Sequence, residues 1–146
     1  MNLFDTIREP PRFEQITDPR LVQAKQLTAL VEWGKSVREL FIDYETTGLH
    51  PRKGDAPFSC QLFAPDKGAK MIDFRYLGDN GRAAVKDALS QRTGKTVAYN
   101  MAFETRMSRA MGFEVSGSLY CAMTAAYALH ESRPSYGAWG PLTQKA

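Results

Sequence analysis

Hydrophobic residues along the chain follow two different spacings, which separate predicted strands from predicted helices. Short apolar runs bounded by Gly, Pro or Asp favour strands, whereas apolar positions three or four residues apart favour helices. The predicted strands cover residues 13–17, 37–43, 58–63, 70–74 and 96–99. The predicted helices run from an Asp18 cap to Gly34, from an Asn80 cap through Leu89, from Met101 to Met111, and from Met123 to Leu129.

The order of these elements predicts the fold class. Pro65, Asp66 and Gly68 suit a hairpin turn between two of the strands, whereas the later strands alternate with helices. Such an order favours an α/β fold with a mixed sheet flanked by helices. We find no repeats or linkers, so we interpret residues 1–12 as an N-terminal lead and residues 13–146 as one domain.

An aspartate and a glutamate follow the apolar run Leu40 to Ile42. Because alternate side chains of a strand point to the same face, Asp43 and Glu45 are predicted to point together. Two neighbouring carboxylates repel each other unless a cation or a shared proton relieves them. The stretch therefore predicts a metal site, although a solvated surface turn is the simpler alternative.

A second acidic position follows the strand that ends at Tyr99. Asn100 comes next, and Phe103 and Glu104 fall on the first turn of the predicted helix, where the helix dipole favours an acid. Glu104 can join Asp43 and Glu45 if the two strands are neighbours. The alternative is purely structural, with Asn100 as an N-cap and Glu104 as an ordinary first-turn glutamate.

Composition limits the class of protein. A chain of 146 residues with 43% hydrophobic residues has the size of one ordinary domain. No apolar run is long enough to span a bilayer, and the first residues do not fit a signal peptide, so we expect a cytoplasmic protein with no membrane partner.

Cys60 and Cys121 show no CxxC spacing and are expected to be reduced thiols. From Gly81 onward, eight Lys or Arg against four Asp or Glu permit a polyanionic partner.

The two acidic stretches together resemble a known family. DxETTGL from Asp43, followed by N-x-x-[FY]-[DE] at residues 100–104, resembles the first two motifs of the DEDD-type 3′–5′ exonucleases of ribonuclease H-like fold. The closest resemblance is to the proofreading exonuclease domain of family A DNA polymerases. It covers nearly the whole chain, including residues 13–33 and 119–132. The resemblance implies a ribonuclease H-like sheet and a metal-dependent enzyme that hydrolyses DNA from the 3′ end.

The resemblance also implies roles for single residues. Asp43, Glu45 and Glu104 match the catalytic ligands of two divalent ions, Mg²⁺ or Mn²⁺, and Glu104 stands where the family more often has Asp. The residues that match contacts to the terminal nucleotide and to the path of the single strand are Thr46, Thr47, Gly48, Leu49, Asn100 and Phe103. The chemistry is consistent, because hard divalent ions prefer oxygen ligands and two of them can activate water and stabilise the leaving 3′ oxygen.

The chain departs from the family pattern in two respects. The third motif, Tyr-x-x-x-Asp, has no counterpart because no Asp follows Asp87, so we interpret the chain as the front portion of the domain, incomplete at its C-terminus. Tyr127 and Glu131 offer a substitute, but this stretch matches a structural helix of the family, and we interpret His130 as a polar helix-end residue. Cys121 stands where the family usually has an aspartate that opens this helix.

The predicted function is a metal-dependent 3′–5′ exonuclease domain, the proofreading part of a DNA polymerase in a bacterial or phage-infected cell. Its expected partners are a single-stranded DNA 3′ end and a polymerase portion in the same or another chain. One alternative is a catalytically inactive exonuclease-like module that binds nucleic acid or another protein. Another is a standalone RNA exonuclease. No residue of the sequence is assigned to a contact with the 2′-hydroxyl, so the preference between DNA and RNA stays open. Without the third motif, this chain alone is expected to be a poor nuclease.

Overall fold

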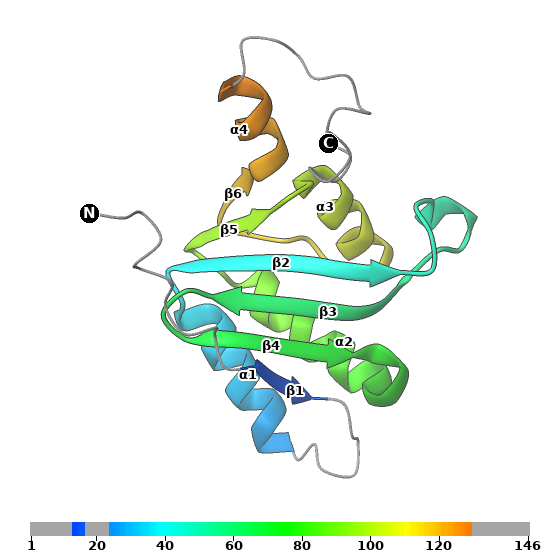
Figure 1. Cartoon of the computed structure of the whole chain (residues 1–146). Helices are drawn as coiled ribbons and strands as arrows, with labels where there is room; N and C mark the ends of the chain where they lie inside the picture. The colour runs from blue at the N-terminus through cyan, green and yellow to red at the C-terminus, as the bar shows by residue number, and fades with distance from the viewer. Residues whose placement is uncertain (1–12, 17–23, 130–146) are drawn as a thin grey trace, which may run out of the picture.

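One mixed sheet of six strands is formed within residues 13–16 and 24–129, the part of the chain that the computed structural model describes (Figure 1). The strands are β1 (Phe13–Ile16), β2 (Glu39–Thr46), β3 (Pro57–Ala64), β4 (Gly68–Asp73), β5 (Lys95–Ala98) and β6 (Ser118–Cys121), in the spatial order β1-β4-β3-β2-β5-β6. β3 pairs antiparallel with β2 and β4, whereas the pairs β1 and β4, β2 and β5, and β5 and β6 are parallel. The predicted α/β class with a mixed sheet is confirmed.

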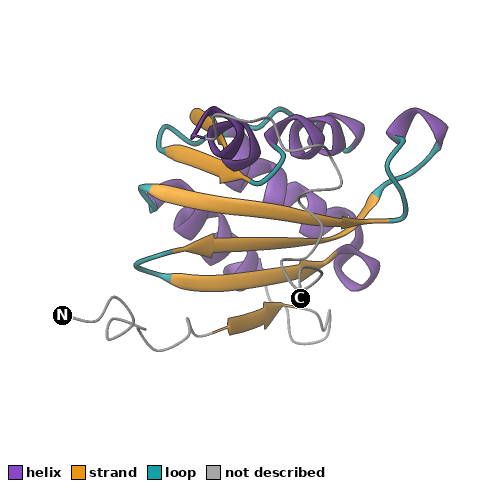
Figure 2. Cartoon of the chain, turned by 45° about the horizontal axis from the view of Figure 1, so that its top comes forward, coloured by secondary structure: helices purple, strands orange, loops and turns teal. Residues whose placement is uncertain are grey.

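The helices are α1 (Ala24–Ser36), α2 (Phe74–Ser90), α3 (Met101–Ala110), α4 (Ala122–Leu129) and the short 3₁₀ helix η1 (Pro51–Lys53). α2 and α3 pack against this sheet, and α1 packs on α2 (Figure 2). α1 and α2 lie against each other, and a Cβ atom on Gly34 would come within 2.7 Å of the Ala88 Cβ, so this close approach requires glycine. Among the described helices, none combines the length and the apolar composition needed to cross a membrane.

The alternation along β2 decides which face of the sheet carries the core. Leu40, Ile42 and Tyr44 are buried and join one hydrophobic cluster with residues of α1, α2 and α3. Burial of this apolar area stabilises the fold by roughly 25 cal/mol per Å² removed from water. The alternate residues Phe41, Asp43 and Glu45 point to the opposite face and are exposed. Core packing therefore fixes the direction in which both acids point.

A buried arginine links the end of α1 to the start of β5. The Arg92 guanidinium donates hydrogen bonds to the carbonyl oxygens of Gly34, Val37 and Lys95 and to the Thr96 hydroxyl. Burial lowers its pKa, but a guanidinium remains charged at neutral pH. These bonds satisfy the buried cation and help hold β5 beside β2, where the site is built.

Several predicted boundaries differ from the structure. α2 begins at Phe74, not after an Asn80 cap, because the Asp73 side chain accepts a hydrogen bond from the Arg75 N–H and caps the helix. Gly78, with φ of 51°, interrupts the helix before Asn80. α1 continues past Gly34 to Ser36, and the predicted cap at Asp18 lies outside the described residues. β6 was not predicted from the sequence.

Candidate active site

Asp43 and Glu45 lie on the exposed face of β2, as the alternation along a strand predicts. In the antiparallel register with β3, Asp43 faces Gln61 and Glu45 faces Ser59. β2 extends to Thr46, so the prediction that the strand ends at Asp43 is wrong, and so is the alternative of a surface turn. Partial burial and then the negative charge of Glu45 raise the pKa of Asp43. The two carboxylates thus repel each other.

Glu104 occupies a different environment. Asn100 caps α3, and its side-chain oxygen accepts a hydrogen bond from the Phe103 N–H at 3.2 Å. Glu104 follows on the first turn and is only 3% exposed. Burial, together with the negative charge of Asp43, raises the pKa of Glu104 to about 8, although the Tyr44 N–H favours the charged form. Its Oε2 atom is buried without a hydrogen-bond partner in the described part of the chain, an arrangement that costs free energy.

The three acids come from two neighbouring parallel strands. β2 carries Asp43 and Glu45, and β5, which pairs with β2, leads into α3 and Glu104. The negative charges of Asp43 and Glu45 both raise the pKa of Glu104, so the three groups interact electrostatically. Sequence reasoning anticipated this arrangement from the two strand ends, but it did not anticipate that Glu104 is buried.

The structure does not bring the three carboxylates together as a formed metal site. Within residues 24–129, no group of three or more His, Cys, Asp or Glu side chains is placed to hold a metal ion. The predicted convergence on two divalent ions therefore stays a prediction. The donors nevertheless suit such ions, because all three are carboxylates, and hard cations prefer oxygen. The Oε2 atom of Glu104 is buried and has no hydrogen-bond partner among the described residues, so a bound cation could satisfy it once the group is deprotonated.

The loop after β2 is held closed by its own hydrogen bonds. The Thr46 hydroxyl donates to the Gly48 carbonyl at 2.8 Å, and the Thr47 hydroxyl accepts the Ala56 N–H at 3.1 Å. A Cβ atom on Gly48 would come within 2.5 Å of the Asp55 carboxylate, so a larger residue at this position would displace the Asp55 side chain. Both threonines therefore shape the loop, and their predicted contact with a 3′ nucleotide stays a prediction.

Two apolar side chains were predicted to contact the single strand. Leu49 is 64% exposed, so its side chain is accessible for stacking on a base. Phe103 is half-buried and packs against the core, and the Arg106 guanidinium lies 5.9 Å from its ring centre. The amide oxygen of Asn100 is already used as the helix cap. Only Leu49 of these three has a mainly exposed side chain.

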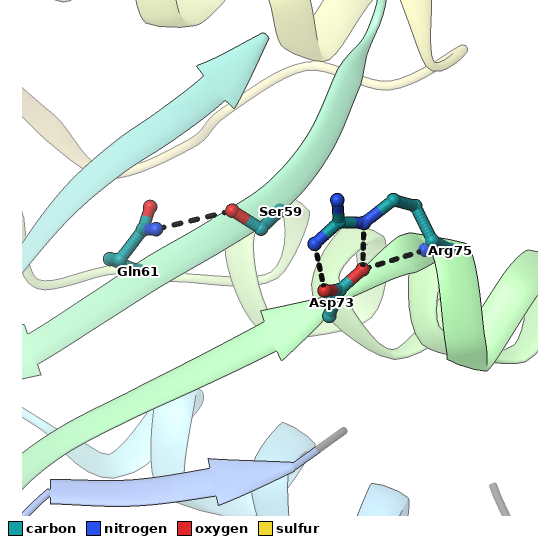
Figure 3. A network of polar contacts seen from close by, with 4 residues as sticks. All are labelled: Ser59, Gln61, Asp73 and Arg75. Atoms are coloured by element: carbon teal, nitrogen blue, oxygen red, sulfur yellow. Dashed lines mark hydrogen bonds and ion pairs between the residues drawn. The ribbon is translucent and has the colours of Figure 1, made fainter. Parts of the chain in front are cut away.

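Polar contacts on the neighbouring strand β3 and on β4 were not predicted (Figure 3). Gln61 donates a hydrogen bond to the Ser59 hydroxyl at 3.2 Å, and Arg75 binds both carboxylate oxygens of Asp73, at 2.9 and 2.5 Å. Ser59 on β3 is the cross-strand partner of Glu45 on β2 and of Asp73 on β4. Glu45 and Asp73 therefore lie on the same face of the sheet, with Ser59 between them. Because Arg75 already neutralises it, Asp73 does not supply the fourth carboxylate.

Further residues support the site from behind. The Tyr44 hydroxyl hydrogen-bonds the Ser108 hydroxyl at 3.0 Å, and this contact holds α3 against β2. The alternation of buried and exposed positions along β2 could have identified Tyr44 as a buried residue behind Asp43 and Glu45. Cys121, the departure from the family pattern, donates from its thiol to the Tyr99 carbonyl at 3.4 Å. Of the proposed substitute motif, Tyr127 lies on α4, whereas His130 and Glu131 lie outside the described residues.

Comparison with known proteins identifies the fold. No protein-family profile matches the sequence, and no curated protein sequence matches it. The POL domain of Pol1 from M. smegmatis, solved in complex with DNA primer-template and dNTP, superimposes with a TM-score of 0.62 at 14% identity, over 79% of this chain and 20% of that chain. Escherichia coli RNase D, an exoribonuclease involved in structured RNA processing, has a TM-score of 0.62 at 15% identity, over 87% of this chain and 32% of that chain.

A third solved structure, Brucella melitensis NrnC with bound Mg²⁺, has a TM-score of 0.50 at 19% identity, over 86% of this chain and 58% of that chain. At these identities the likeness shows the fold alone, and it confirms the predicted ribonuclease H-like class with its mixed sheet flanked by helices. The chain spans between 20% and 58% of the length of these three neighbours.

Proposed function

We propose that this chain is a metal-dependent 3′–5′ exonuclease domain that removes nucleotides from the 3′ end of a DNA strand. One observation carries the proposal: on an exonuclease fold, Asp43, Glu45 and Glu104 lie at neighbouring parallel strands and repel one another, and one oxygen of Glu104 is buried without a partner in the described residues. Such an arrangement is unfavourable in the absence of cations, and strongly shifted pKa values concentrate at functional sites.

In this proposal Asp43, Glu45 and Glu104 hold the metal ions. Two Mg²⁺ or Mn²⁺ ions bound there would activate a water and stabilise the leaving 3′ oxygen. Leu49 stacks on the terminal base, which tolerates any base sequence because every base has an apolar face. The loop at Thr46 to Gly48 holds Leu49 in place through its hydrogen bonds.

Glu104 gives the proposal a pH dependence. With a pKa of about 8, its carboxyl group is mostly protonated at pH 7 in the metal-free protein. A ligand must be deprotonated to bind a cation, so metal binding releases this proton. The apparent affinity for Mn²⁺ is therefore expected to rise as the pH increases towards 8.

The proposal that the substrate is DNA and that the role is proofreading rests mainly on the sequence. The DxETTGL stretch resembles polymerase proofreading domains, and a polymerase structure, solved with DNA primer-template, is among the fold neighbours. RNase D has the same fold, so RNA is the competing substrate. In the DNA proposal, a polymerase portion of the same or another chain delivers the unpaired 3′ end to Leu49 and the carboxylates.

A second candidate function is a catalytically inactive module that binds nucleic acid. It is favoured by the finding that no group of three potential ligands is placed to hold a metal among the described residues. In that case Glu104 stays protonated and Asp43 is dispensable. The two candidates thus differ in their need for Asp43 and for divalent ions.

The direct test is digestion of single-stranded oligonucleotides, DNA and RNA, each labelled at the 5′ end, with and without Mn²⁺. Digestion is measured for this chain and for any longer natural form, together with Asp43→Asn and the control Asp66→Asn. Asp66 lies in the turn between β3 and β4, outside the site. We expect shortening from the 3′ end that requires Mn²⁺ and Asp43, strongest in a form that carries a further Tyr and Asp. Binding without digestion in every form would instead support the inactive module.

A further inference from the structure

A cavity of about 720 Å³ opens between the loop after β2 and the outer face of α3. This size is within the range of ligand-binding sites. Its walls come from two segments that are far apart in the sequence but in contact in the fold, η1 with its preceding residues and the second half of α3. The lining residues are Leu49, His50, Pro51, Arg52, Lys53, Arg106, Arg109 and Ala110.

Cationic residues surround the cavity, whose walls are otherwise largely apolar. Four of the eight lining residues are Lys or Arg, one is His, and none of the described lining residues is an acid. Arg109 is engaged at the rim by Glu114 at 2.7 Å. Arg52, Lys53 and Arg106 form no ion pair within residues 24–129. Gathering these cations is unfavourable without an anionic partner, so the charge points to an anionic ligand.

The two walls are held in fixed positions. Pro51 begins η1, and Gly54 ends it with φ of 96°, a conformation that favours glycine. The Asp55 carboxylate accepts a hydrogen bond from the His50 N–H at 2.8 Å and so ties the start of η1 to its end. The opposite wall is a regular helix, α3, which also packs on β2 through Ser108. The cations are therefore displayed on defined elements.

The cavity adjoins the predicted stacking residue. Leu49 is one of its lining residues, whereas Glu104 and Arg106, two positions apart on α3, point to different sides of the helix, Glu104 into the protein and Arg106 to the cavity. A strand whose last base lies on Leu49 would pass its preceding phosphates over Arg52, Lys53 and Arg106. Arginine and lysine are the side chains that bind phosphates most often.

We propose that this cavity binds the phosphodiester backbone of the single strand, immediately upstream of the 3′ nucleotide. The inference rests on the proposed function for its orientation, but the binding itself needs no metal and no chemistry. The contacts are to phosphates, so DNA and RNA strands should bind alike and base sequence should matter little. The cavity thus supplies the affinity for the strand that the three repelling carboxylates cannot provide.

Binding of fluorescent oligo-dT and oligo-rU is measured by anisotropy in EDTA over a range of salt concentrations. The test variant combines Arg52→Gln with Arg106→Gln, and the matched control combines Arg38→Gln with Arg82→Gln, which removes two charges elsewhere. We expect roughly tenfold weaker binding of both strands for the test variant, with a salt slope shallower by about 1.4, because each phosphate contact on a single strand contributes about 0.7. The control should bind like the unmodified protein.

Further variants make the result decisive. Arg52→Lys combined with Arg106→Lys should keep the salt slope, and circular dichroism verifies that every variant is folded. An unchanged slope for the folded Gln variant, or an equal loss in the control, would overturn the proposal. Asp43→Asn separates it from the proposed function, since binding in EDTA should survive this substitution even if digestion is lost. Digestion that needs Asp43 but is indifferent to Arg52 and Arg106 would reject the cavity and leave the exonuclease proposal intact.

Discussion

Asp73 and Glu104 are two buried carboxyl groups with opposite behaviour. Each lies at the start of a helix that follows a strand, and their exposed fractions are similar, 4% and 3%. Hydrogen bonds from the Arg75 side chain lower the pKa of Asp73 despite its burial, whereas burial raises the pKa of Glu104 to about 8. The Arg75 partner thus favours the charged form of Asp73, whereas burial without such a partner favours the protonated form of Glu104. Asp73 has its cation within the chain, and we propose that Glu104 receives its cation from solution.

The largest expected difference between the two is catalytic. Glu104→Gln should lower the rate of 3′ end digestion by about two to four orders of magnitude, a range typical of losing a positioned catalytic group. Asp73→Asn should leave the rate within a few fold, because asparagine still caps α2. Both rates are measured on the same single-stranded DNA in Mn²⁺. Equal losses in the two variants would mean that Glu104 is only structural.

The next difference concerns stability and pH. Because the folded pKa of Glu104 is raised from 4.5 to about 8, the folded state binds more protons than the unfolded state between these values. The free energy of unfolding should therefore fall as the pH rises from 4.5 to 8, by on the order of a few kcal/mol. Urea unfolding in EDTA measures this slope, and Glu104→Gln should flatten it. A slope that persists in this variant would assign the titration to another group.

Asp73 should behave in the opposite way. Its pKa is lowered in the folded state, so its contribution is present above pH 3.8 and is lost as the pH falls through the folded pKa. Asp73→Ala removes the helix cap and should lower the free energy of unfolding at pH 7 by about 1 to 2 kcal/mol. Urea unfolding at pH 7 tests this, with Asp73→Asn as the variant that retains the cap. A fully stable Asp73→Ala would show that the cap is dispensable.

The smallest expected effect comes from the arginine itself. Arg75→Gln leaves Asp73 without its cation, but Arg75 is largely exposed, and solvent screening makes the effect on the free energy of unfolding small. Its signature is a rise in the pKa of Asp73, which NMR titration of the carboxyl carbon can follow. If the pKa stays low, the helix cap alone accounts for the charge state of Asp73.

The same two residues show how far the sequence allowed prediction. Hydrophobic periodicity placed most strands, and the alternation along β2 predicted correctly that Asp43 and Glu45 point together. Glu104 was identified as a site residue, but its burial depends on the packing of α3 against β2, where Ser108 of α3 hydrogen-bonds Tyr44, 64 residues away in the sequence. Asp73 was missed because its role depends on the cross-strand register with Ser59 and on Arg75, which local periodicity does not reveal.

Other differences between the prediction and the structure also have identifiable physical causes. The predicted start of α2 at Asn80 was wrong because the turn before Gly78 is also helical and is capped by Asp73. β6 was missed because it is short and largely exposed, so it shows no clear apolar pattern. The basic cavity combines η1 with α3, two segments that only the fold brings together.

The central claim is that Glu104 requires a divalent cation from solution, and thermal unfolding with and without Mn²⁺ at pH 7 tests it most directly. A ligand that binds only the folded state raises the melting temperature by mass action. The account predicts a rise of several degrees for the unmodified chain and for Asp73→Asn, and little or no rise for Glu104→Gln and Asp43→Asn. A melting temperature indifferent to millimolar Mn²⁺ in the unmodified chain, or an equal rise in Glu104→Gln, would contradict it.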